Sequence, residues 1–91
     1  MEKKAENSTT NYAPEKVTEA VEIHFTKIVS GGNTTISGTI KKGSADAGTV
    51  SFETTGNYLI TQLKPYNALT ADEVTAVYAA VPGCITEMLN D

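Results

Sequence analysis

The chain has 91 residues, 40% of them apolar, and its 11 acidic residues outnumber its 7 lysines and arginines to give a net charge of −4. A chain of this length can form one small domain, which buries roughly 60–65% of its unfolded surface. The negative charge argues against a nucleic-acid partner, because such binding relies on clustered Lys and Arg side chains at the phosphates. One cysteine cannot form an internal disulfide or a thiolate cluster for zinc, so no metal or cofactor is predicted.

The hydropathy of the chain bears on its location. No apolar run approaches the roughly 20 residues that a membrane span needs, so we expect none, and the N-terminus lacks the apolar core of a secretory signal. Two locations stay open: the cytoplasm, or a surface-tethered position for an exported protein whose leader lies outside this sequence. Residues 1–16, MEKKAENSTTNYAPEK, are almost wholly polar, and we expect a disordered tail there. Residues 17–91 form the single predicted domain.

Four segments of the chain alternate apolar and polar residues with a period of two, as half-buried strands do. In the first segment, Val21, Ile23 and Phe25 fall on one face. Glycines and other turn residues separate the segments, which predicts an antiparallel meander of three to four strands, the fourth having the poorest pattern. The segments are VEIHFTKIV (21–29), TTISGTIKK (34–42), GTVSFETT (48–55) and YLITQL (58–63).

The loop lengths predict the register of the sheet. If Gly31 and Gly32 form a two-residue hairpin loop, the apolar faces of the first two strands coincide, and Phe25 lies opposite Gly38. A five-residue loop between the second and third strands then places Phe52 on the other side of Gly38. We therefore predict a row of Phe25, Gly38 and Phe52 across the sheet, in which the two rings cover the glycine.

After the fourth segment, the apolar spacing changes to the 3.6-residue period of a helix. Thr70 is the predicted N-cap, and Glu73 lies three residues on, as a capping box requires. The apolar stripe continues past Pro82, so we expect a kinked helix or two helical segments, over about 71–80 and 83–89. The predicted fold class is α+β, with this helical region packed on one face of the meander.

Cys84 and His24 are the side chains best suited to nucleophilic chemistry, but the predicted fold separates them. Cys84 falls on the apolar stripe of the helix, so we predict that it is buried, and His24 lies on the polar face of the first strand. The sequence contains no phosphate-binding glycine loop and no spacing typical of a catalytic triad, so no catalytic or metal-binding residue is predicted. These observations favour a non-enzymatic protein-interaction or assembly module.

The face of the sheet opposite the helix is the predicted binding surface. It is broad, weakly charged and rich in Thr and Ser, which is also typical of a plain solvated sheet surface. The functional interpretation is a surface for a protein partner or a homodimer, because a strand edge beside it can accept another chain. The alternative function is a small-ligand carrier or minor enzyme that uses a cleft between sheet and helix near Tyr58, Tyr66 and Tyr78. The predicted partner-binding residues are Glu22, His24, Thr26, Thr35, Ser37, Thr39, Thr49, Ser51 and Glu53.

Overall fold

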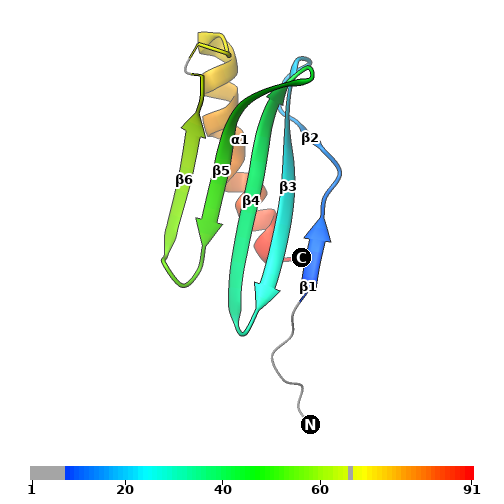
Figure 1. The fold of residues 1–91 in the computed structure, drawn as a ribbon, viewed down its shortest axis with the longest axis vertical. Helices are drawn as coiled ribbons and strands as arrows, with labels where there is room; N and C mark the ends of the chain where they lie inside the picture. The colour runs from blue at the N-terminus through cyan, green and yellow to red at the C-terminus, as the bar shows by residue number, and fades with distance from the viewer. Residues whose placement is uncertain (1–7, 66) are drawn as a thin grey trace.

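The computed structural model describes residues 8–65 and 67–91, which form one antiparallel sheet with a single helix on one of its faces (Figure 1). This confirms the α+β class, but the sheet has six strands instead of the predicted three to four. The elements are β1 (Ser8–Asn11), β2 (Glu15–Lys16), β3 (Val21–Ser30), β4 (Asn33–Lys42), β5 (Ala45–Glu53), β6 (Tyr58–Leu63) and α1 (Ala71–Leu89).

The two N-terminal strands differ from the sequence prediction, which placed residues 1–16 in a disordered tail. Both β1 and β2 pair antiparallel with β3 and form one edge of the sheet. Thr26 Oγ1 donates a hydrogen bond to Asn11 Oδ1 at 2.9 Å, and Tyr12 packs against the core. Backbone pairing needs no apolar side chains, which is why the polar composition of this segment did not reveal its strands. Residues 1–7 lie outside the described part of the chain.

The β3–β4 hairpin has the predicted register. Gly31 and Gly32 form its two-residue loop with φ of 60° and 86°, in the left-handed region that glycine adopts without strain. Ile23 therefore lies opposite Ile40. The apolar sides of the two strands coincide, so both residues contribute to one core.

The β4–β5 hairpin departs from the predicted register. Its loop contains two residues instead of five, and one further residue, Ala47, forms a bulge in β5. As a result Val50 lies opposite Gly38, and the predicted row of Phe25, Gly38 and Phe52 is wrong. The actual register differs by two positions, which keeps each side chain on its predicted face of the sheet.

α1 runs without interruption from Ala71 to Leu89, so the predicted break at Pro82 is wrong, while the kink stays a prediction. Pro82 and Gly83 are exposed, so the missing backbone hydrogen bond lies on the solvent side of the helix. On the opposite side, a continuous apolar stripe packs against the sheet on both sides of Pro82 and stabilises the helix across it. The buried residues of this stripe are Val77, Val81, Ile85 and Met88.

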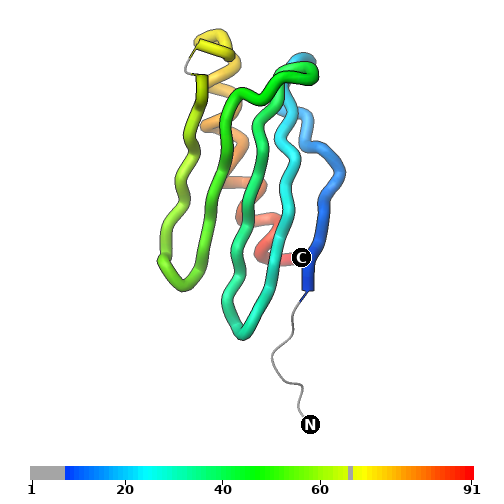
Figure 2. Tube along the Cα trace, in the orientation of Figure 1, coloured from blue at the N-terminus to red at the C-terminus, as the bar shows by residue number. Residues whose placement is uncertain are grey.

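α1 crosses one face of the sheet diagonally, from the end nearest β6 to the C-terminus beside β1 (Figure 2). Lys27 Nζ donates to the Met88 carbonyl at 2.8 Å, and Tyr12 Oη donates to Asp91 Oδ2 at 2.8 Å, which attaches the end of the helix to β3 and to the segment after β1. The core lies between the sheet and α1. Its fully buried side chains are Val21, Ile23, Ile36, Ile40, Val50, Val77 and Val81.

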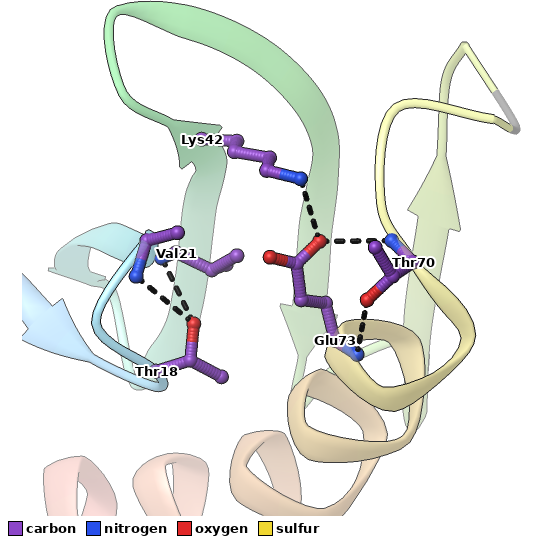
Figure 3. Close-up of polar contacts among 6 residues, drawn as sticks. Thr18, Val21, Lys42, Thr70 and Glu73 are labelled. Carbon is purple, nitrogen blue, oxygen red and sulfur yellow. Dashed lines mark hydrogen bonds and ion pairs between the residues drawn. The ribbon is translucent and has the colours of Figure 1, made fainter.

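The start of α1 has the predicted capping box and an ion pair that the sequence pattern did not reveal (Figure 3). Glu73 N–H donates to Thr70 Oγ1 at 3.2 Å, and Thr70 N–H donates to Glu73 Oε1 at 2.8 Å. Lys42, the last residue of β4, donates to the same carboxylate oxygen at 2.9 Å. The hydrogen bond from the Thr70 backbone, and after it the one from Lys42, hold the pKa of Glu73 below its ordinary value.

Replacing Glu73 with glutamine is expected to lower stability at neutral pH and to reduce the loss of stability in acid. A carboxylate whose pKa is lowered by folding stabilises the fold fully above its ordinary value of 4.5, and this contribution is lost as the pH falls through the lower folded value. Glutamine keeps the capping hydrogen bond but not the charge. Urea unfolding at a series of pH values from about 7 to about 3 measures the effect; a variant as acid-sensitive as the parent chain would contradict it.

Candidate functional site

The side of the sheet that α1 does not cover is an open surface built from rows of short hydroxyl side chains. Residues opposite one another in an antiparallel sheet point to the same side, so the strand pairing fixes these rows. We call this surface the uncovered face. Its central rows, from β3 through β4 to β5, are Thr26, Ser37, Ser51 and His24, Thr39, Thr49.

All nine residues of the predicted binding surface lie on the uncovered face, three from each of the strands β3, β4 and β5. Ser37 and Thr49 are exposed, and the other seven are half-buried between their neighbours. The strand pairing thus brings the predicted set together on one surface. That this surface binds a partner stays a prediction.

The charged side chains of the uncovered face lie toward its ends. Lys41 Nζ donates to Asp46 Oδ1 at 2.7 Å, and His24 Nε2 lies 3.2 Å from Glu22 Oε1. Glu53 stands at the opposite end, in the row of Thr35. The row of Thr26, Ser37 and Ser51 carries no charged group, so another polypeptide can approach this row without covering a charge.

β6 adds an apolar margin to the uncovered face that the predicted site did not include. Tyr58 continues the row of Glu53 with 41% of its surface exposed, and Ile60 continues the row of Ser51 with 53% exposed. Leu59, which points to the helix side of the sheet, is also 41% exposed. Sequence reasoning missed this margin because the apolar pattern of β6 did not show which side faces the core. The lack of charge in YLITQL was the available signal.

The backbone of β6 also presents unpaired groups. In the part of the chain that the structure describes, β6 pairs only with β5, and Lys64 N–H donates to the Ala47 carbonyl in β5 at 2.9 Å. Backbone groups of successive strand residues point to opposite sides. The N–H and C=O groups of Leu59, Thr61 and Leu63 therefore point away from the sheet, where they can accept another strand.

The opposite edge of the sheet is less suited to strand addition. It consists of β1 and β2, which have four and two residues. Tyr12, Ala13 and Pro14 separate them, and proline has no N–H to donate to an added strand. The apolar, uninterrupted edge of this sheet is therefore β6.

A cleft of about 300 Å³ lies between the segment Tyr12–Glu15 and the end of α1. Cys84 lines this cleft and is half-buried, so the prediction of a buried Cys84 is wrong. Desolvation raises the pKa of the Cys84 thiol, and the nearby carboxylates of Glu15 and Glu87 raise it further. The thiol therefore stays protonated at neutral pH, which disfavours a role as nucleophile.

The tyrosines of the alternative site do not lie on one surface. Tyr58 belongs to the uncovered face, whereas Tyr78 lies on α1, on the other side of the sheet, with 50% of its surface exposed. Tyr66 lies outside the described residues. The two described tyrosines therefore do not form the walls of a common cleft.

Further observations on residues 8–65 and 67–91 concern metals and membranes. These residues contain no group of three or more His, Cys, Asp or Glu side chains that could hold a metal ion. Over the same ranges, no helix combines the length and the apolar character that crossing a bilayer requires. Comparison of the chain with protein-family models, curated proteins and solved structures gave no match.

Proposed function

We propose that this chain is a non-enzymatic assembly module that binds protein through the uncovered face of its sheet and the adjoining edge of β6. The observation that carries this proposal is the position of Tyr58, Leu59 and Ile60, three consecutive exposed apolar residues on an edge strand. Proteins usually protect such edges with charged residues, proline or bulges, but no residue of β6 is charged. A partner on this edge removes the apolar side chains from water.

The hydroxyl-rich part of the uncovered face suits the same role. Short Ser and Thr side chains lose little conformational entropy when they are covered, and each hydroxyl can both donate and accept hydrogen bonds. Ser37, at the centre of the face, has no bulky neighbour within its row of Thr26 and Ser51. Protein interfaces commonly combine apolar anchors with surrounding polar contacts, and here β6 supplies the anchors.

The double substitution Ser37→Arg with Thr39→Arg tests the proposal. Two long charged side chains at the centre of β4 would hold a partner away from the face, and we expect binding to weaken about tenfold or more. The matched control is Thr75→Arg with Thr86→Arg, two exposed positions on α1. Affinity capture with the tagged full chain measures the effect. If the β4 variant retains every protein that the parent and the control capture, the face is not the binding surface.

The cleft beside Cys84 favours a second candidate, a small-ligand carrier. Its volume of about 300 Å³ is at the lower limit for small-molecule sites. Glu15, Glu87 and Asp91 line it, so a compact cationic ligand such as an amine fits its charge. Titration with amine fragments, followed by NMR shifts of Cys84 and its neighbours, tests this candidate; an absence of shifts at millimolar fragment would exclude it.

A further inference from the structure

We propose that the partner at the β6 edge is a second copy of this chain, whose β6 pairs antiparallel with the first across a twofold axis at Thr61. This inference rests on the proposed function and names its partner. The unpaired backbone groups of the edge belong to Leu59, Thr61 and Leu63. In the proposed register, Thr61 lies opposite Thr61 of the second copy, and Leu59 lies opposite Leu63 of the second copy.

This register uses all of the outward-pointing backbone groups of β6. Each opposed pair among Leu59, Thr61 and Leu63 can exchange two hydrogen bonds. An axis at Ile60 instead pairs Leu59 with Thr61 of the second copy and leaves Leu63 beyond the paired region. The next outward position is Pro65, which has no N–H, so the pairing ends where β6 ends.

The side chains are complementary in the same register. On the uncovered face, Tyr58 lies opposite Lys64 of the second copy, and Glu53 is the neighbour of Tyr58 on β5. The lysine can therefore reach both the tyrosine ring and the glutamate carboxylate, and the twofold axis repeats this contact. On the helix side, Leu59 meets Leu63 of the second copy, which covers a leucine that is 41% exposed in the single chain.

The two edges of the sheet differ, and from this difference we predict that assembly stops at two copies. Twofold pairing uses β6 of both copies and leaves only the edges formed by β1 and β2, which Ala13 and Pro14 interrupt. Strand pairing over six residues covers less area than a standard interface, so we expect a dissociation constant on the order of micromolar.

Cysteine cross-linking tests the register. In a Cys84→Ala background, which removes the only native thiol, Thr61→Cys is expected to form an intermolecular disulfide under mild oxidation. Opposed residues of this kind lie about 5.5 Å apart at Cα, within the range that disulfides span. Ile60→Cys is the control for the alternative axis and should not cross-link with itself. Leu59→Cys and Leu63→Cys should cross-link only when the two variants are mixed.

Sedimentation of the full chain between about 1 μM and about 1 mM tests the dimer itself. Thr61→Pro removes an N–H that makes no bond within the sheet, and we expect it to weaken the dimer about tenfold or more. Ile60→Lys, which adds a charge on the exposed side of the edge, gives a second test if the proline variant fails to fold. Thr75→Lys, on the exposed side of α1, should leave the dimer unchanged.

Several results would overturn this proposal. They are a monomer at about 1 mM, a dimer that survives both edge substitutions, particles larger than a dimer, and cross-linking at Ile60 in place of Thr61. Failure here is distinguishable from failure of the proposed function, because the arginine substitutions at Ser37 and Thr39 lie on β4, which β5 separates from the β6 edge. If the chain is a monomer but those two substitutions abolish the capture of its protein partners, the assembly role stands. Only the second copy is then excluded as the partner.

Discussion

Replacing Gly48 with alanine is expected to destabilise the protein by about 3 kcal/mol or more. Gly48 lies opposite Leu63 in the β5–β6 pair. A Cβ atom at this position would lie well inside van der Waals contact with the Gln62 carbonyl oxygen and 3.0 Å from Leu63 Cα. These are backbone atoms of the neighbouring strand, so no rotation of a side chain relieves the clash. The strand β6 must shift, and urea unfolding measures the cost.

Gly83→Ala is the matched control for this prediction. A Cβ atom at Gly83 has no neighbour within 4 Å, and the residue lies inside α1, where alanine is about 1 kcal/mol better than glycine. The same chemical change is therefore expected to destabilise the chain at Gly48 and to stabilise it at Gly83. A Gly48→Ala variant as stable as the parent would show that β5 and β6 do not approach each other as described.

Replacing Pro82 with alanine is expected to stabilise the protein by about 2 kcal/mol. Proline inside a helix costs about 3 kcal/mol, because it removes the hydrogen bond to the carbonyl four residues earlier, here that of Tyr78, and crowds it. Pro82 is exposed, so its ring contributes little to the core. Alanine restores the hydrogen bond, and the greater freedom of the unfolded chain offsets up to about 1 kcal/mol of the gain.

Thermal and urea unfolding of Pro82→Ala, compared with the parent, measure this gain. The slope of the urea transition should stay constant, because the substitution changes little of the surface that unfolding exposes. A lower midpoint for the variant would mean that the proline ring makes stabilising contacts or that α1 is not continuous at Pro82.

The sequence predicted most of the sheet because a period of two and a two-residue glycine loop restrict the backbone strongly. The loop of Gly31 and Gly32 has few alternatives that keep two apolar faces together, so the register of β3 and β4 followed from it. The β4–β5 loop was ambiguous, because a short loop with a bulge at Ala47 and a longer loop place the same residues on the same face. Patterning therefore predicted the faces of β5 but not its register.

The remaining errors have physical causes of two kinds. β1 and β2 are held by backbone pairing and polar contacts, such as Asn11 with Thr26, which leave no hydropathy signal. The break in α1 was predicted from the local cost of Pro82, but the packing of the helix on the sheet outweighs that cost. Tertiary contacts determine both outcomes, and a single sequence does not display them.

Only the polar part of the candidate site could be predicted from the sequence. The alternation of residues along β3, β4 and β5 placed nine residues on one face. The error in the β4–β5 register did not change this, because a shift of two positions keeps every side chain on the same face. The edge of β6 could not be found in the same way. Its importance depends on the order of the strands and on the direction of its backbone groups, which the hydrogen bond from Lys64 to Ala47 reveals.

Residue-resolved amide hydrogen exchange, measured on the full chain at about 0.1 μM and about 100 μM, tests the central claim that β6 pairs with β6 of a second copy. The amides of Ile60 and Gln62, which bond to β5, should exchange slowly at both concentrations. Those of Leu59, Thr61 and Leu63 should exchange rapidly in dilute protein and slow down as the concentration rises. Equal exchange of these three amides at both concentrations would contradict the claim.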